Sequence, residues 1–142
     1  VTVPLWKETM AAVCAPDYLP GKSSLTLEEL SGKALLLRER GSGSRSCVDS
    51  VFLSKGLTVL PAMESASTGA LLSAAKEAIG IAVLSKSTAQ ADLLCGHLKR
   101  LIICDCEFGR NYFLVYHKNK YLTAKTKQVI KLIQTEFASE TA

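Results

Sequence analysis

The sequence contains no long hydrophobic segment and few aromatic residues. Its apolar runs are all far shorter than the roughly 18 residues that a membrane-spanning helix needs. Its first residues also lack the basic-then-apolar order of a secretory signal peptide. Aromatic residues make up 6% of the 142 residues and hydrophobic residues 48%, which predicts an aliphatic core in one domain or two small lobes. We therefore expect a cytoplasmic protein that does not contact a membrane.

The sequence also lacks the common catalytic motifs. The patterns G-x-S-x-G, H-E-x-x-H and G-x-G-x-x-G are absent, and the loop 41–45 does not end in the Lys-Ser/Thr pair of a Walker A motif. The two histidines, His97 and His117, lie in or beside apolar runs. Because no nucleophile is paired with a base, we do not expect an enzyme.

The cysteine content argues against a disulfide framework. Five is an odd number, and the cysteines are spread through apolar segments, which favours reduced thiols. Cys104 and Cys106 would share one face of a strand predicted over residues 97–106, but two histidines elsewhere are a poor complement for structural zinc. We expect Cys104 and Cys106 to be buried as small hydrophobic residues. We also expect reduced thiols with neither a metal nor a cofactor at the five positions Cys14, Cys47, Cys95, Cys104 and Cys106.

The positive charge is concentrated towards the C-terminus. Residues 1–96 hold nine Lys/Arg and nine Asp/Glu, whereas residues 97–142 hold eight and four, which accounts for the formal net charge of +4. These basic residues are spread over a predicted strand and one helix, and stacking aromatics are few. We therefore do not expect this chain to bind nucleic acid directly.

The hydrophobic pattern predicts an α/β fold in which strands and helices alternate. The N-terminal segment 1–15 is predicted to form one or two strands with a charged turn at Lys7-Glu8. Because the chain begins within this strand pattern and without Met, we expect it to be part of a longer protein. The remaining predicted strands are 34–37, 58–60, 81–84, 97–106 and 111–117. Helices are predicted over residues 25–30 and 88–94, and a further one begins near Ser67. Another has the apolar face Cys47, Val48, Val51 and Phe52, with or without Leu53. The last, over residues 123–137, has Val129, Ile130, Ile133 and Phe137 on one face.

Two junctions between a predicted strand and the following helix carry small polar residues. Unpaired amide groups at a helix start favour anions, and short βαβ connections place successive parallel strands side by side. We therefore predict that both junctions lie together and bind a small anion. The candidate residues are Ser42, Gly43, Ser44 and Arg45 in one junction and Ser65, Ser67 and Thr68 in the other. Two alternatives remain: the hydroxyls only cap the helices, and Arg45 is a surface charge paired with Asp49.

An ordered set of short motifs resembles the effector-binding domain of LysR-type transcriptional regulators. Ser85 replaces a usual proline and Ala78 a usual glycine, so we expect the end of the helix at 66–78 to differ from the family pattern. The matching segments are Ala15-Pro16 with Leu27-Glu28-Glu29-Leu30, Arg38-Glu39 with Gly41-Ser42-Gly43-Ser44-Arg45, Glu64-Ser65 with Ser67-Thr68, residues 79–84, residues 98–101 and residues 112–118.

This resemblance implies a periplasmic-binding-protein-like (type II) lobe with a mixed, mostly parallel sheet flanked by helices. Residues 1–14 would be hinge and first-lobe strands, residues 15–106 the second lobe, and residues 107–142 the returning hinge strand and C-terminal helix of the first lobe. The family's DNA-binding domain and the first half of its effector domain have no counterpart in the sequence. The implied partners are a small anionic effector, DNA only through that N-terminal domain, and further copies in a homo-oligomer.

Two alternatives from other classes stay open. One is a fragment of a transport-type solute-binding protein with the same general fold, which a secretory leader in the full gene would indicate. The other is an enzyme built on that fold, which would need catalytic groups outside this sequence.

Overall fold

The computed structural model describes residues 1–138, which belong to two compact units. The larger unit is Thr9–Gly109, and the smaller one combines Val1–Glu8 with Arg110–Ala142. Within residues 1–138, no helix is both long enough and apolar enough to cross a lipid bilayer. The assignment of residues 15–106 to a second lobe stays a prediction.

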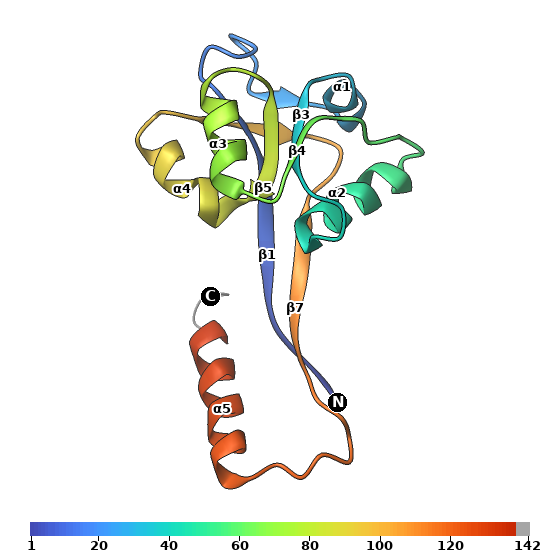
Figure 1. Ribbon diagram of the computed structural model, residues 1–142, viewed down its shortest axis with the longest axis vertical. Helices are drawn as coiled ribbons and strands as arrows, with labels where there is room; N and C mark the ends of the chain where they lie inside the picture. The colour runs from blue at the N-terminus through green and yellow to red at the C-terminus, as the bar shows by residue number, and fades with distance from the viewer. Residues whose placement is uncertain (139–142) are drawn as a thin grey trace. The chain divides into compact units, whose positions relative to one another are not determined.

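A mixed sheet forms the centre of the larger unit (Figure 1). Its strand order is β2-β6-β1-β5-β3-β4, in which β2–β6, β3–β5 and β3–β4 are parallel pairs, whereas β1 is antiparallel to both β5 and β6. This confirms the predicted mixed and mostly parallel sheet. The strands are β1 (Thr2–Cys14), β2 (Ser24–Leu25), β3 (Leu35–Arg38), β4 (Pro61–Ser65), β5 (Ile81–Ser85) and β6 (Lys99–Ile103).

Helices cover both faces of this sheet, as its two apolar faces require (Figure 1). Side chains alternate along β3: Leu35 and Leu37 pack with α1 (Leu27–Ser31) and α2 (Gly43–Ser54) on one face. Leu36 packs on the other face with α3 (Thr68–Lys76), and α4 (Lys86–Leu94) contributes Ala89 to the same cluster. All three β3 leucines are fully buried.

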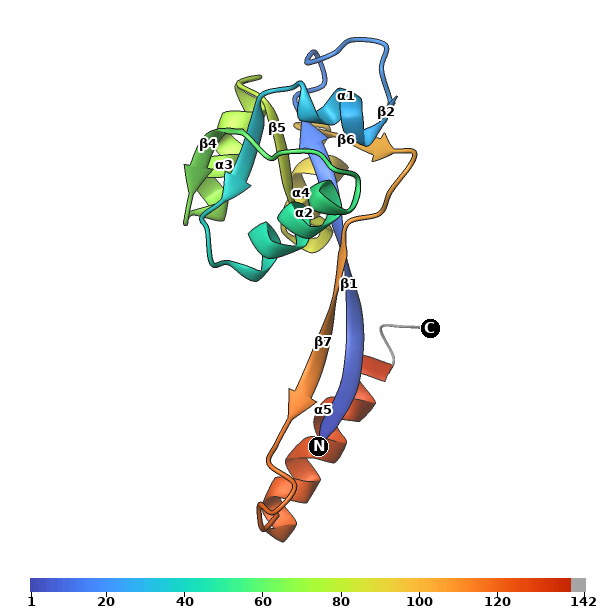
Figure 2. The same ribbon diagram turned by 90° about the vertical axis from the view of Figure 1, so that its right-hand side faces the viewer.

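The smaller unit consists of a two-stranded β-ribbon and the C-terminal helix. The first half of β1 pairs with β7 (Gly109–Val115), and α5 (Ala124–Ala138) lies beside this ribbon (Figure 2). Trp6 stacks on the rings of both Tyr112 and Phe137, with centroid distances of 4.3 and 4.0 Å. Thr123 caps α5, because its Oγ1 accepts a hydrogen bond from the Thr126 amide.

Two predicted features of the strands are wrong. The charged turn at Lys7-Glu8 is absent, because β1 continues through it and the Glu8 carboxylate accepts bonds from Arg110 and Tyr112 of β7. The β-prone run 58–60 is not a strand. Instead β4 begins at Pro61, where pairing with β3 begins, and the preceding loop packs Leu57 and Val59 against the core.

The burial predicted for several apolar residues is also wrong. β6 ends at Ile103, so Cys104 and Cys106 lie in the turn after it, and Cys104 is exposed. This turn is held by the Asp105 carboxylate, which accepts a bond from the Leu27 amide at the start of α1. Val129 is 54% exposed, so it does not belong to the apolar face predicted for α5. Leu53 is 76% exposed, so the apolar face of α2 does not extend to it.

Candidate functional site

The two predicted junctions lie side by side at one edge of the sheet. β3 and β4 are neighbouring parallel strands, and Arg38 at the end of β3 is in register with Ser65 at the end of β4. Each strand leads within a few residues into a helix, α2 or α3, so both helix starts follow carboxyl ends at the same edge. The predicted adjacency of the two junctions is therefore confirmed.

The first junction is a tight turn closed by a helix cap. Gly41 has a φ of +94°, a left-handed conformation that glycine adopts without strain. Ser42 is the N-cap of α2, and its Oγ accepts a hydrogen bond from the Arg45 amide at 3.1 Å. Gly43 is the exposed first residue of the helix, and the Ser44 side chain is buried.

The second junction is organised in the same way. Ser67 is the N-cap of α3, and its Oγ accepts a bond from the Ala70 amide at 3.2 Å. Ser65 Oγ accepts a bond from the Ser67 amide at 3.1 Å. Thr68, the first residue of α3, makes no cap, but its Oγ1 accepts a bond from Arg38 Nη1 at 3.4 Å. Ser42 and Ser67 thus each use one hydrogen bond of the hydroxyl oxygen to cap a helix. A ligand role for the predicted site residues stays a prediction.

Arg45 connects the two junctions from inside the protein. Its Nε donates to Asp49 Oδ1 at 2.8 Å, and its Nη1 donates to Glu64 Oε2 at 2.7 Å and to the carbonyl oxygen of Arg38 at 3.2 Å. The pairing with Asp49 is confirmed, but Arg45 is not a surface charge, because its side chain is only 2% exposed. The hydrogen bond from Arg45 holds the pKa of the Glu64 carboxyl below its usual value. Arg45 Nε and Nη1 are therefore both engaged in hydrogen bonds within the protein.

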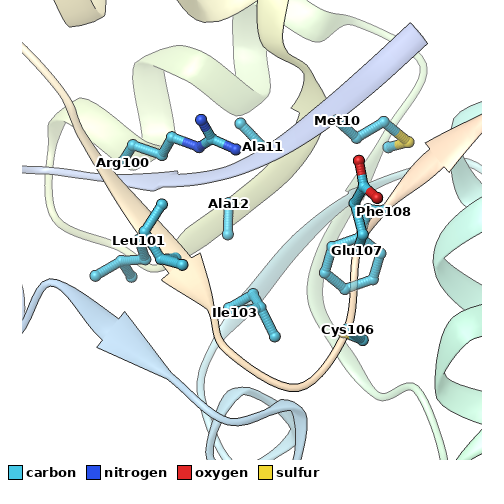
Figure 3. Close-up of a pocket in the computed structure, with 10 residues that line it drawn as sticks. Met10, Ala11, Ala12, Arg100, Leu101, Ile103, Cys106, Glu107 and Phe108 are labelled. Atoms are coloured by element: carbon cyan, nitrogen blue, oxygen red, sulfur yellow. The ribbon is translucent and has the colours of Figure 1, made fainter. Parts of the chain in front are cut away.

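A cavity of about 250 Å³ lies elsewhere in the larger unit, between β1, β6 and the segment 106–108 (Figure 3). Arg100 and Glu107 are the charged residues that line it. Of its apolar lining residues, Met10, Leu101 and Phe108 are each at most 3% exposed, whereas Ile102 is 49% exposed. None of the seven predicted site residues lines this cavity.

The profile of the LysR substrate binding domain matches residues 1–138. The chain belongs to this family. It is 28% identical over 123 residues to the uncharacterized HTH-type transcriptional regulator YeiE of Escherichia coli K12, covering 87% of this chain and 42% of YeiE. It is 29% identical over 128 residues to the HTH-type transcriptional regulator CbbR of Rhodospirillum rubrum, covering 88% of this chain and 42% of CbbR. This LysR-family chain thus spans less than half the length of these relatives.

A solved structure agrees with the fold of this LysR-family chain. The regulatory domain of CcmR from Synechocystis PCC6803, in complex with 2-PG, superposes with a TM-score of 0.82 at 25% identity. The match covers 96% of this chain and 66% of the CcmR domain. The family membership and this superposition confirm the predicted periplasmic-binding-protein-like fold.

The LysR-family chain places two further polar residues at the same edge, which sequence reasoning did not select. Arg38 ends the buried strand β3, and strand periodicity puts its side chain on the same face as Leu36 and α3. Ser85 ends β5, which is parallel to β3, and it is 8% exposed with its Oγ 2.8 Å from Ser87 Oγ. The sequence does contain a signal for both residues, because each is the polar or charged residue that directly follows a buried apolar run.

Metal-binding side chains are not clustered in the described chain. Between residues 1 and 138, no group of three or more His, Cys, Asp and Glu side chains is arranged to hold a metal ion. Cys104 and Cys106 therefore have no third ligand of these types within this range.

Proposed function

We propose that this chain is the effector-binding part of a LysR-type transcriptional regulator and that it senses a small anionic metabolite. Its family membership and its similarity to regulators such as CbbR support the transcriptional role. The CcmR domain with the same fold was solved with the small molecule 2-PG. In this proposal the regulator is a cytoplasmic homo-oligomer without catalytic activity, which reaches DNA only through a domain outside this chain.

One observation carries the anion-binding part of this proposal: the starts of α2 and α3 lie together at the carboxyl ends of the adjacent strands β3 and β4. A helix start presents amide groups without partners in the helix and the positive end of the helix dipole. Two such starts at one sheet edge favour a carboxylate or phosphate group more than one alone does. The proposed contacts are Ser42, Gly43, Ser44, Ser65, Ser67 and Thr68, with Arg45 as the charge behind them.

The proposed domain organisation follows from the family resemblance. Residues 15–106 would form the second lobe of the effector domain. Residues 1–14 and 107–142 would supply hinge strands and the C-terminal part of the first lobe. The sequence encoded before Val1 tests this organisation, because a winged helix-turn-helix there would establish a LysR-type regulator.

Thr68 provides the sharpest mutational test, because its hydroxyl takes no part in capping α3. Thr68→Val keeps the shape of the side chain and removes the hydroxyl. In the full-length regulator we expect Thr68→Val to weaken the response to the effector about tenfold. The melting temperature should stay near that of the wild type. A reporter promoter, tested with a panel of small carboxylates and phosphate esters, measures the response.

Two further variants separate ligand binding from folding. Thr58→Val removes the hydroxyl of an exposed loop threonine and should leave the response unchanged. Ser67→Ala removes a cap and should cost about 1 kcal/mol of stability. If Ser67→Ala lowers the melting temperature while induction stays intact, Ser67 only caps the helix. If Thr68→Val also responds normally, the proposed site is wrong.

A further inference from the structure

Arg38 and Glu39 form a two-pronged ion pair at the carboxyl end of β3. Arg38 Nε donates to Glu39 Oε2 at 2.8 Å, and Arg38 Nη2 donates to Glu39 Oε1 at 3.1 Å. Two parallel N–H···O bonds between a guanidinium and a carboxylate are the geometry by which arginine recognises carboxylates and phosphates in general. The remaining nitrogen, Nη1, donates to Thr68 Oγ1 in the neighbouring junction.

This pair is exposed enough to open. The side chains of Arg38 and Glu39 are 26% and 37% exposed, and Glu39 lies just beyond the last residue of the strand. The hydrogen bonds from Arg38 hold the pKa of the Glu39 carboxyl below its usual value, so Glu39 is ionised at neutral pH. Exposed ion pairs of this kind are only slightly favoured over their separated, hydrated partners. A second oxyanion can therefore compete for the same guanidinium.

Arg45, which also lies at this edge, is unsuited to such an exchange. Its side chain is 2% exposed and already bonded to two carboxylates and a carbonyl oxygen. Removing one partner from a buried charge network leaves an uncompensated charge, which is strongly unfavourable. Of these two arginines, Arg38 is thus the one whose carboxylate partner can leave into water.

We propose that Arg38 binds the oxyanion group of the effector and that Glu39 is an internal competitor for its guanidinium. This inference rests on the proposed effector-binding function and names the residue that selects the ligand class. A carboxylate or phosphate that replaces Glu39 keeps the two bonds and the charge balance at Arg38. It also lies beside Thr68, whose hydroxyl is within reach of the same guanidinium. Neutral ligands lack the charge needed to displace Glu39, so they are rejected.

Glu39→Gln tests the competition directly. The amide is neutral and competes poorly for the guanidinium, so oxyanions should bind Glu39→Gln about three- to sixfold more tightly than the wild type. The probes are acetate and inorganic phosphate, titrated against chloride at equal ionic strength into the ¹⁵N-labelled 142-residue chain. The Arg38 Nε–Hε signal, identified by its loss in Arg38→Gln, reports binding. Comparison of the two probes tells whether a carboxylate or a phosphate is the preferred group.

Matched variants distinguish binding by the two-pronged hydrogen bonds of the Arg38 guanidinium from binding by positive charge alone. Arg38→Gln should abolish the binding, which amide signals of Thr68 and Ser67 can follow when the arginine signal is absent. Arg38→Lys keeps the charge without the fork and should bind several-fold more weakly than the wild type. Glu28→Gln makes the same charge change on α1, and Arg40→Gln removes the neighbouring exposed positive charge; both should leave the affinity within about twofold, as expected for exposed charges.

Three results would overturn the proposal: unchanged affinity in Glu39→Gln, unchanged affinity in Arg38→Gln, or equal tightening in Glu28→Gln. Failure of this inference is distinguishable from failure of the proposed function. A regulator that still responds to its effector when Arg38→Gln is introduced keeps the function and loses this role for Arg38. A chain that binds acetate or phosphate through Arg38 within a regulator insensitive to small anions keeps the anion site and loses the effector function.

Discussion

Gly80 lies where the start of β5 comes closest to the neighbouring chain. A side-chain Cβ at this position would overlap the carbonyl oxygen of Ala34, which accepts the hydrogen bond from the Ile81 amide at 2.8 Å. Neither backbone can move away without disturbing the pairing of β3 with β5. We expect Gly80→Ala to cost about 2 to 3 kcal/mol of unfolding free energy, measured by urea denaturation.

Gly69 in α3 is the matched control for that prediction. A Cβ there would meet only Ser67 Oγ, at an ordinary contact distance of 3.8 Å. Because alanine favours a helix over glycine, Gly69→Ala should stabilise the protein by up to about 1 kcal/mol. Equal effects of the two substitutions would contradict the close approach at Gly80.

The five thiols differ in accessibility, which makes their reactivity predictable. Cys95 and Cys104 are exposed, Cys47 and Cys106 are half-buried, and Cys14 is fully buried. Burial raises the pKa of the Cys14 thiol, and burial together with the charge of Asp105 raises that of Cys106. We expect an aromatic disulfide reagent to label two thiols rapidly in the native protein and five after denaturation. Fewer than five after denaturation would indicate a disulfide or a bound metal.

At the scale of an element, α3 ends in a conformation that suits glycine better than its own residue. Ala78 has a φ of +57°, its amide bonds to the Ala75 carbonyl, and the Ile79 amide bonds to Ala74, which together form a Schellman motif. α4 ends in the same way with Gly96 at the corresponding position, at a φ of +74°. Ala78 stands where the family pattern has glycine, and it adopts the left-handed conformation that glycine favours.

Ala78→Gly should therefore stabilise the protein. Relief of the left-handed strain is worth about 1 kcal/mol, partly offset by the greater chain entropy of glycine in the unfolded state. We expect a net gain of about 0.5 kcal/mol in denaturant unfolding. Gly96→Ala is the reciprocal variant and should destabilise. Destabilisation by both substitutions would show that the end of α3 is not strained.

An aromatic stack joins α5 to the β-ribbon. Trp6, the single tryptophan of the chain, lies between Tyr112 of β7 and Phe137 of α5, nearly parallel to both rings. Each aromatic pair contributes about 0.5 to 1.5 kcal/mol beyond its buried area. Trp6→Leu should thus speed amide exchange in α5 by about tenfold or more, while β3 and β5 stay protected. Phe113→Leu, at a half-exposed position on β7, serves as the control.

At the scale of the whole molecule, the net charge belongs entirely to the smaller unit. Residues 9–109 hold ten Lys/Arg and ten Asp/Glu, whereas residues 1–8 and 110–142 hold seven and three. The basic residues of this unit are spread over β1, β7, α5 and the segment between β7 and α5. Among its residues up to 138, α5 is the one helix, so no helix-turn-helix is present there. We expect the purified chain to show no sequence-specific gel shift at near-physiological salt. Any shift should be abolished by added salt or competitor DNA. A shift specific for one DNA sequence would contradict this.

The sequence by itself determined the class of fold, most of its strands and helices, and the two helix starts. Buried strands such as β5 contain continuous apolar runs, here residues 81–84, and the serines that cap α2 and α3 are residues with a strong preference for that position. Such local signals need no knowledge of distant contacts. The boundaries that failed, at residues 58–60 and 97–106, depend on pairing with β3 and β2, which lie far away in the sequence.

Only the tertiary structure decided the roles of the charged residues at the candidate site. The spacing of Arg45 and Asp49 on one helix predicted their contact, but the burial of Arg45 depends on Glu64, which follows 19 residues later and arrives through the parallel pairing of β3 and β4. The same pairing brings Thr68 to Arg38 across 30 residues. Which arginine is locked and which can exchange its partner depends on burial, and burial is a property of the assembled sheet and helices rather than of any local segment.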